Sequence, residues 1–420
     1  MRIWRKGVLA SFPTGFLLLL VIAWGLPVQK AEGLSQFARK YKVDCTTCHT
    51  AFPRLNYFGE LFFRNGFQWP GEPPDGDTVG KEEISENLVI DQVGNWFGAR
   101  VGLTPLEYKT NARTRNSILE DTFDVGNADF FALFLAGSLF KNVSIFVEAE
   151  FKTDEFETEF AHVIFTNLYD TFVNFQVGLI NPSEFSSYSD GKRIWQKSDI
   201  LNVKSSGGGG ENSTNVRSSR PGILYYGYKG PFVWFGGVDN GKDATDTDND
   251  KNLWGGLRLE VPNTVKSPFV GSSISYMYYQ GQDTSGGLGT AGTPALQQQN
   301  DFFRHTIAAN IRFKTNLELM GVYQFGRDDN FKIATLPGPT KAEFHGYTLA
   351  GAYKRDDWYY VLQYDEINSD DVASLDLTKV SPSIWYYLRD NFKMGFAMRF
   401  DVRGNDPVKN EYTVVIRTMF

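Results

Sequence analysis

Apolar and polar residues alternate along most of the chain from residue 97 onward. Every second residue from Phe392 to Val402 is apolar, whereas Lys393, Gly395 and Arg399 lie at positions between them. The stretch 302–313 follows the same pattern. Because successive side chains of a strand point to opposite faces of a sheet, the alternation predicts strands with one apolar and one polar face.

The alternating segments predict sixteen strands, at 97–107, 128–138, 142–152, 158–168, 171–180, 220–229, 231–239, 251–260, 268–280, 301–314, 316–326, 343–354, 357–366, 378–388, 391–403 and 410–420. Most links after even-numbered strands are tight turns, whereas links after odd-numbered strands include the long segments 181–219 and 281–300. A soluble β-sandwich alternates too, but this asymmetry and the even strand number are typical of outer-membrane barrels. We therefore predict an all-β, porin-like barrel of sixteen strands over residues 97–420. Both of its ends should lie on the short-turn, periplasmic side.

The first 31 residues have the layout of a secretory signal. Arg2, Arg5 and Lys6 precede an apolar stretch that runs to Val28. An uncleaved anchor helix is the alternative, because the apolar stretch is long enough to span a membrane. Either interpretation exports the remaining chain.

A single motif carrying redox chemistry follows the signal: Cys45-Thr46-Thr47-Cys48-His49. The pattern C-x-x-C-H is the attachment sequence of c-type haem. Two thiols at this spacing can bind the two vinyl groups of one porphyrin, and the adjacent histidine is then an axial ligand of the iron. We therefore predict one covalently attached haem c, with Cys45 and Cys48 as thioether residues and His49 as the proximal iron ligand.

Three other interpretations compete with haem. A Cys45–Cys48 disulfide is compatible with an oxidising compartment. A thioredoxin-like dithiol would need a surrounding βαβ pattern, and a zinc site would need a fourth ligand. The chain has no further cysteine and no such pattern, so haem is favoured.

Residues 50–66 predict one short helix, with Pro53 at its first position and Asn65-Gly66 at its end. Its apolar face either covers the porphyrin or packs on the rest of the protein, and consists of Leu55, Phe58, Leu61 and Phe62. A linker rich in proline, glycine and acidic residues follows. The predicted organisation is a signal peptide at 1–31, a monohaem cytochrome segment at 32–70, a linker at 71–96 and the barrel at 97–420.

The second axial ligand has no obvious source, since residues 32–70 hold no methionine and no histidine besides His49. Lys40 and Lys42 are unusual donors, and the ligand can also be absent. The alternation along each strand assigns His305 and His345 to the lipid-facing side. The candidates on the lumen-facing side are His162, Met277 and Met320. His162 and Met320 rank first among them.

Composition narrows the class of protein further. The 15% aromatic content excludes a disordered chain, and no apolar run after residue 30 is long enough for a spanning helix. A net charge of −7 argues against nucleic-acid binding. Acidic residues gather near 239–250 and 365–376, which we interpret as solvated extracellular loops.

The haem segment and barrel together resemble the fused cytochrome–porin family, which includes the iron-oxidising outer-membrane cytochromes. The resemblance is specific in the haem segment and generic in the barrel, and it rests on Cys45, Cys48, His49, Pro53, Leu55, Asn56, Gly59, Asn65, Gly66 and Phe67. It implies a small haem-carrying plug inside an outer-membrane barrel. It also implies contact with membrane lipid, an extracellular Fe(II) donor and a periplasmic c-type cytochrome as electron acceptor.

Two classes of function follow from this sequence. The first is electron transfer through a haem in the lumen, from extracellular Fe(II) to a periplasmic cytochrome, or outward to an extracellular acceptor. The second is a transport porin whose haem segment is a structural or gating plug. The reduction potential of the haem decides the direction of electron flow, and this potential does not follow from the sequence.

Overall fold

A computed structural model of the whole chain describes residues 36–71, 82–85, 88–90, 93–115, 118–152, 155–189, 196–205, 214–241, 251–285, 298–331, 341–404 and 408–420. The predicted signal peptide at 1–31 lies outside these residues.

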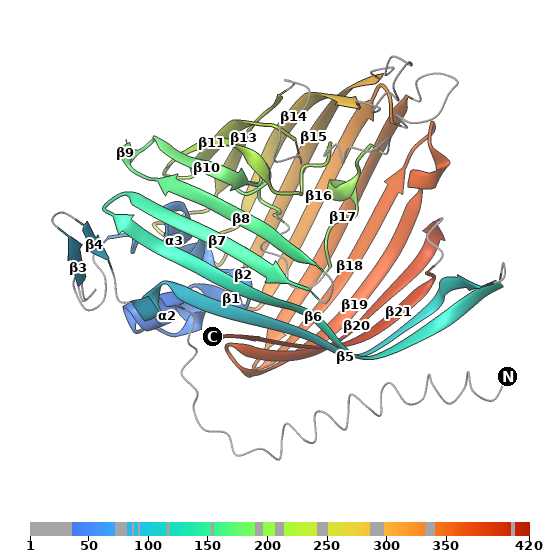
Figure 1. Cartoon of the computed structure of the whole chain (residues 1–420), viewed down its shortest axis with the longest axis horizontal. Coiled ribbons are helices and arrows are strands. Elements are labelled where there is room, and N and C mark those ends of the chain that lie inside the picture. The colour runs from blue at the N-terminus through green and yellow to red at the C-terminus, as the bar shows by residue number, and fades with distance from the viewer. Residues whose placement is uncertain are drawn as a thin grey trace.

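Sixteen antiparallel strands form a closed barrel (Figure 1). They are β5 (Phe97–Arg115), β6 (Ile118–Phe140), β7 (Val143–Phe151), β8 (Phe156–Phe165), β10 (Asn174–Ile180), β11 (Arg220–Lys229), β12 (Phe232–Asp239), β13 (Asn252–Glu260), β14 (Ser273–Ser285), β15 (Gln298–Phe313), β16 (Leu317–Asp328), β17 (Ala342–Arg355), β18 (Trp358–Asn368), β19 (Leu377–Arg389), β20 (Phe392–Gly404) and β21 (Asn410–Met419). The barrel closes where β21 pairs with β5. The predicted fold and strand number are confirmed.

The two faces of the wall differ as the alternation predicts. Along β16, Leu317, Leu319 and Tyr323 are exposed on the outer face, whereas Glu318 and Gln324 are buried on the inner face. β16 thus has an apolar outer face and an inner face that carries buried polar and charged groups, as expected for a wall with lipid outside and a lumen inside. Among the helices described here, none has the length and apolar character needed to cross a membrane.

The first hairpin is much longer than the alternation indicated. Residues 108–115 and 118–127, predicted to be part of a loop, belong to β5 and β6. The two strands stay paired through two register shifts, one after Gly102 and one after Lys109. Bulges insert extra residues and break the period-two pattern, so the continuation was not visible as alternation.

The connection between β10 and β11 folds into the barrel instead of extending outward. Its short helical turn η4 (Ile200–Asn202) is buried, and the Ile200 carbonyl accepts a bond from the side chain of Gln324 on β16 (2.9 Å). Ser198 bonds Thr348 on β17 (2.7 Å). These partners lie on the opposite wall, so the connection narrows the lumen.

The N-terminal segment also lies inside the barrel. It contains α2 (Gln36–Tyr41), the turn η1 (Cys45–Thr47), a small hairpin of β1 (His49–Ala51) and β2 (Arg54–Leu55), and α3 (Tyr57–Arg64). Its backbone carbonyls accept bonds from β7, β11 and β17, through Ser144, Tyr226 and Lys354. Because these strands stand on different sides of the barrel, the segment between them occupies the lumen. We call residues 36–71 the plug.

The plug lies at the short-turn end of the barrel, near the C terminus and away from the extended β5–β6 hairpin (Figure 1). Between plug and barrel, the chain forms a separate two-stranded hairpin of β3 (Glu82–Ser85) and β4 (Leu88–Ile90), followed by η2 (Val93–Asn95). The predicted linker at 71–96 therefore contains some regular structure.

Replacing Leu349 by arginine tests the orientation of the wall. Leu349 lies in the middle of β17 with 52% of its surface exposed, on the outer face. A cation at the bilayer midplane destabilises a barrel by about 2–4 kcal/mol, so L349R should lower the unfolding free energy in lipid vesicles by this amount. L349A is the control and should cost less. Equal losses in urea titrations of the two variants would contradict the assignment.

Candidate functional site

The C-x-x-C-H motif forms a compact turn at the start of the plug. Cys45 begins the helical turn η1, and the amide of Cys48 donates to the Cys45 carbonyl (3.2 Å). Both cysteines are free and half-buried. Burial raises the pKa of Cys45 to about 11 and that of Cys48 to about 12, so both are protonated thiols at neutral pH.

His49 is held in one tautomer by the backbone. Its Nδ1 lies 3.2 Å from the Pro53 carbonyl, which can only accept, so Nδ1 carries the proton and Nε2 keeps its lone pair. Burial lowers the pKa of His49 to about 4, and the ring is neutral at physiological pH. A neutral imidazole whose second nitrogen bonds a carbonyl is the usual form of a metal-ligating histidine.

Asn56 fastens the motif to the helix that follows. Its side-chain amide donates to the carbonyls of Thr46 (3.0 Å) and Thr47 (2.9 Å), while its side-chain oxygen accepts from the Gly59 amide (2.9 Å). The backbone amide of Asn56 donates to the Cys48 carbonyl (2.9 Å). Asn56 therefore caps α3 and fixes the turn that carries both cysteines.

Gly59 is required by the same packing. A Cβ atom at this position would lie 2.1 Å from the Cys48 carbonyl oxygen, which is backbone and cannot move aside. The glycine thus lets α3 approach the motif closely. In the sequence, Asn56 and Gly59 stand out only by the family resemblance, and their contacts with the motif supply the physical reason.

The predicted helix over 50–66 is too long at its start. Residues 49–55 form the β1–β2 hairpin, and α3 begins at Tyr57 after the Asn56 cap. Pro53 is therefore a turn residue whose carbonyl binds His49, not the first residue of a helix. The predicted end is confirmed, because Asn65 caps the helix and Gly66 adopts a left-handed conformation (φ +65°).

The residues of the motif fit a c-type haem. Two free thiols and a neutral histidine with its Nδ1 already hydrogen-bonded form the donor set that covalent attachment and axial ligation need. The disulfide interpretation has no support in the structure, since the thiols are free.

Aromatic side chains pack the plug against one wall. Phe62 and Phe67 are buried together with Tyr41, and Ile164 of β8 completes the cluster. Phe67 also stacks on Phe146 of β7 (5.3 Å between ring centroids). The apolar face of α3 therefore packs on the rest of the protein through Phe62. Phe58 packs against the same cluster, with its ring 4.8 Å from that of Trp69.

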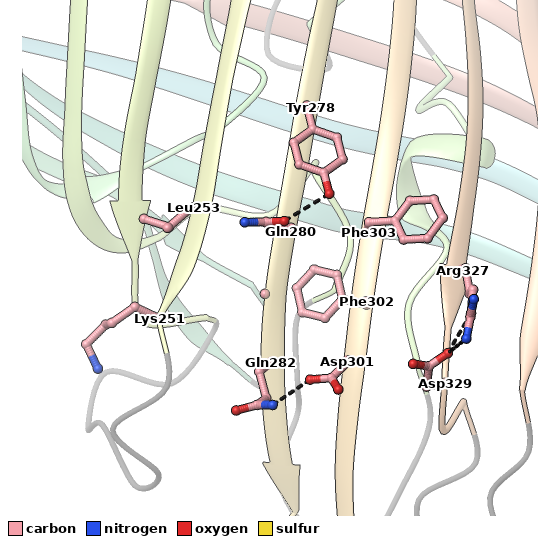
Figure 2. Close-up of a pocket in the computed structure, with 11 residues that line it drawn as sticks. Lys251, Leu253, Tyr278, Gln280, Gln282, Asp301, Phe302, Phe303, Arg327 and Asp329 are labelled. Atoms are coloured by element: carbon pink, nitrogen blue, oxygen red, sulfur yellow. Dashed lines mark hydrogen bonds and ion pairs between the residues drawn. The ribbon is translucent and has the colours of Figure 1, made fainter.

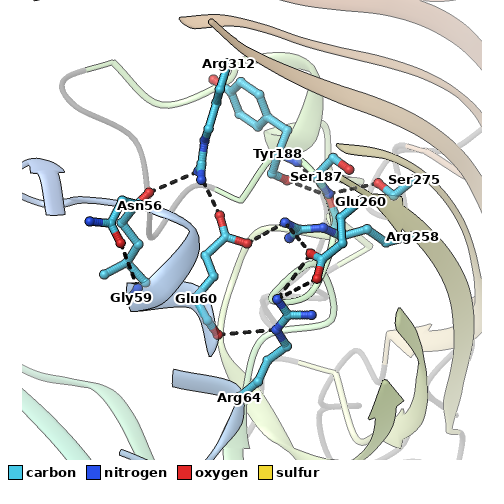
Figure 3. A network of polar contacts seen from close by, with 12 residues as sticks. Asn56, Gly59, Glu60, Arg64, Ser187, Tyr188, Arg258, Glu260, Ser275 and Arg312 are labelled. Atoms are coloured by element: carbon cyan, nitrogen blue, oxygen red, sulfur yellow. Dashed lines mark hydrogen bonds and ion pairs between the residues drawn. The ribbon is translucent and has the colours of Figure 1, made fainter. Parts of the chain in front are cut away.

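A chain of buried ion pairs joins the plug to the opposite wall (Figure 3). Glu60 of α3 lies between Arg312 of β15 (2.8 Å) and Arg258 of β13. Arg258 also contacts Glu260 (3.2 Å), which in turn binds Arg64 of α3 (2.8 Å).

The series of ion pairs continues toward the C-x-x-C-H motif. Arg312 pairs with Glu318 of β16 (2.9 Å), and Glu318 binds Arg54 of the plug (2.7 Å). Every one of these side chains is at most 7% exposed. Positive and negative side chains alternate along this series of ion pairs, so each buried carboxylate lies between two guanidinium groups.

The alternation of polar and apolar residues does not reveal these ion pairs. Arg258, Glu260, Arg312 and Glu318 all occupy the lumen-facing register within a few residues of a strand end on the short-turn side. A cluster of lumen-facing charges at one end of adjacent strands was a usable signal. Their plug partners could not be assigned from sequence, because they lie about 200 to 260 residues away in the chain.

The predicted second ligands face the lumen but lie on opposite walls. His162 of β8 is buried, with Nδ1 2.9 Å from the Leu179 carbonyl, and its Nε2 lacks a partner in the described part of the chain. Met320 of β16 and Met277 of β14 are buried in the inner core cluster. Met320 is two residues from Glu318, which binds Arg54, whereas His162 adjoins Phe146. Their role as ligands stays a prediction.

The remaining candidates for the second axial ligand differ in burial and in the face of the barrel on which they lie. Lys40 is buried, with Nζ 3.5 Å from the Ser138 hydroxyl, and Lys42 is exposed. His305 and His345 lie on the outer register as predicted, and His305 shares a hydrogen bond with the Tyr276 hydroxyl (2.7 Å).

Three acidic residues from the clusters interpreted as loops belong to the wall, at the ends of the predicted strands 231–239 and 357–366: Asp239, Asp365 and Glu366. Asp239 ends β12 and is 1% exposed, and it accepts bonds from Asn252 and Trp254. Asp365 lies in β18, buried among inner-face partners that include Gln363. β12 ends at residue 239 as predicted, and β18 runs two residues further than predicted. Residues 242–250 lie outside the described residues.

An open groove of about 470 Å³ lies at the long-loop ends of β13 to β16 (Figure 2). Outer-register residues such as Leu253 and Asp301 line it, together with the Arg327–Asp329 ion pair. None of its lining residues belongs to the plug. The groove is therefore separate from the C-x-x-C-H motif.

The chain has the fold of porins. An anion-selective porin from Comamonas acidovorans matches with a TM-score of 0.54 at 15% identity, over 77% of this chain and 98% of that one. A refined porin structure and OmpF of Salmonella typhi in complex with daunomycin each give 0.51 at 12% identity, over 77% of this chain and 99% and 97% of theirs. At this identity the likeness concerns the fold alone, and it confirms the predicted barrel of the outer-membrane type. No protein-family model and no curated protein matches the sequence.

Neutralising Glu60 tests whether the ion-pair chain holds the plug. E60Q removes the carboxylate that Arg258 and Arg312 share, and both guanidinium groups stay buried. Breaking a buried ion pair in this way lowers the free energy of unfolding by about 3–5 kcal/mol. The plug should then become accessible, as measured by protease cleavage of the folded protein.

Asp170→Asn is the matched control for E60Q. Asp170 pairs with Lys229, but both side chains are more than 60% exposed, and such pairs contribute at most about 1 kcal/mol. Equal protease resistance of E60Q and the native protein would contradict a holding role for the chain of ion pairs.

Proposed function

We propose that the protein is an outer-membrane electron-transfer protein of the fused cytochrome–porin type. One haem c is attached to Cys45 and Cys48, with His49 as the proximal ligand of the iron. Electrons pass from extracellular Fe(II) to a periplasmic c-type cytochrome. The observation that carries the proposal is the donor set itself: two free thiols and a neutral, oriented histidine within a plug inside the barrel.

The position of the plug inside the lumen supports a role in passing electrons from one side of the membrane to the other. The apolar band of such a barrel is about 25 Å tall, more than one haem can bridge, so a donor from outside has to enter the lumen to reach a haem at the short-turn end. The motif lies inside the lumen at the short-turn end, where Asp390 of the β19–β20 turn is close enough to raise the pKa of Cys45. A periplasmic acceptor docks below this turn, and the donor approaches through the lumen.

Each residue of the site has a defined task. Cys45 and Cys48 hold the porphyrin, and Asn56 keeps their turn against α3. The Pro53 carbonyl orients His49 and leaves its Nε2 free for iron. The bound haem supplies the one-electron exchange, while the protein controls access and potential.

A transport porin with a structural or gating plug is the second candidate. The porin fold supports it directly, since the solved structures with this fold include an anion-selective porin. The buried ion pairs are equally compatible with a plug that only blocks the lumen. Outward electron flow to an extracellular acceptor is a variant of the first proposal that differs only in haem potential.

Adding Fe(II) to the purified, oxidised protein separates the two candidates. Under electron transfer, the visible spectrum should change to that of reduced haem c. The control is Cys45→Ser together with Cys48→Ser, which should lose covalent haem and the spectral response while the barrel still folds. A native protein that carries haem but is not reduced by Fe(II), and that conducts solutes in planar bilayers, would reject Fe(II) oxidation in favour of the porin.

A further inference from the structure

The barrel wall binds the backbone directly after His49. Lys354 of β17 donates to the Thr50 carbonyl (2.8 Å). Lys393 of β20 and Tyr387 of β19 both donate to the Phe52 carbonyl (3.0 and 2.9 Å). Three strands therefore hold the hairpin turn whose Pro53 carbonyl orients His49.

Lys393 places its charge in an aromatic cage. The residue is 1% exposed, and its Nζ lies 4.6 Å from the ring centroid of Trp385. The rings of Tyr387 and Phe52 lie 5.7 and 5.8 Å from the same atom. Rings at these distances stabilise a buried cation, and the effect is largest where water is excluded.

The cage extends to the histidine of the motif. The Phe52 ring, which forms one side of the cage, is 5.7 Å from the His49 ring. The Phe52 carbonyl, which accepts from Lys393, is directly followed by Pro53, whose carbonyl accepts from His49. A buried positive charge is therefore two contacts away from the imidazole.

We propose that Lys393 is a positioning residue that fixes the His49 loop and raises the reduction potential of the haem. The proposal rests on the haem assignment made above. Ferric haem carries one more positive charge than ferrous haem, so a nearby buried cation favours the reduced form. A barrel strand, and not the plug alone, then sets the potential at which the protein accepts an electron.

Lys393→Met and Lys393→Arg in the full-length protein test the proposal. Methionine fills the cage without a charge, whereas arginine keeps the charge. The readout is the midpoint potential, from an equilibrium redox titration followed by haem absorbance. K393M should shift to a lower potential than the native protein, and K393R should restore most of the difference.

Lys379→Met is the matched control. Lys379 is also buried on the inner face of β19, but it pairs with Asp199 (3.3 Å) in the connection between β10 and β11. Its removal should leave the potential unchanged. Gel mobility without heating verifies that each barrel is folded.

The outcomes separate this inference from the function on which it rests. A native protein without covalent haem would overturn both. A haem-loaded, folded K393M with the native potential would overturn only the role of Lys393, and so would a shift of equal size in K379M. A haem that is not reduced by Fe(II) but shifts in K393M would support the role of Lys393 and reject the donor.

Discussion

The placement of the plug depends on buried charges that neither the plug nor the wall can satisfy alone. Within the plug alone, Arg54 of β2 and Glu60 and Arg64 of α3 would be charges without barrel partners. Arg312 and Glu318 would likewise be charges on the inner wall of an empty barrel. Removing such groups from water is expensive unless each finds an opposite charge. Alternation of guanidinium and carboxylate groups satisfies them only when plug and wall meet in one register. The ion-pair chain thereby specifies where the plug stands, and the aromatic contacts on the other wall complete the fit.

The plug has little stability of its own, since a segment of this size cannot build a conventional core. Its helices are six and eight residues long, and Ile164 and Phe146 of the barrel complete the cluster that buries their apolar side chains. The wall also holds the backbone next to His49, through Lys354, Tyr387 and Lys393. A cofactor carried on this segment would experience an electrostatic environment made by the barrel. Function and fold are coupled at this point, because the residues that hold the plug also surround its motif.

Much of the architecture could be read from local pattern. Period-two alternation identified all sixteen barrel strands and placed Met320 and His162 inside and His305 and His345 outside. The pattern failed where backbone geometry departs from it. The bulges of β5 and β6 hid the continuation of the first hairpin. Asp239 and Asp365 were grouped with acidic loops because a cluster of charges in sequence does not show which of its side chains are buried. Pro53 was assigned to a helix start because proline is common there, whereas the contact between its carbonyl and His49 keeps it in a turn.

The sequence by itself determined the closed barrel, its strand number and the presence of a C-x-x-C-H motif, because alternation and residue spacing are local properties. Only the tertiary structure decided what surrounds the motif. Arg54 and Glu318 are 264 residues apart, and Phe52 and Lys393 are 341 residues apart, yet each pair is in hydrogen-bond contact. Contacts of this kind arise when the barrel closes around the plug. They depend on the register of many strands at once, which no local pattern contains.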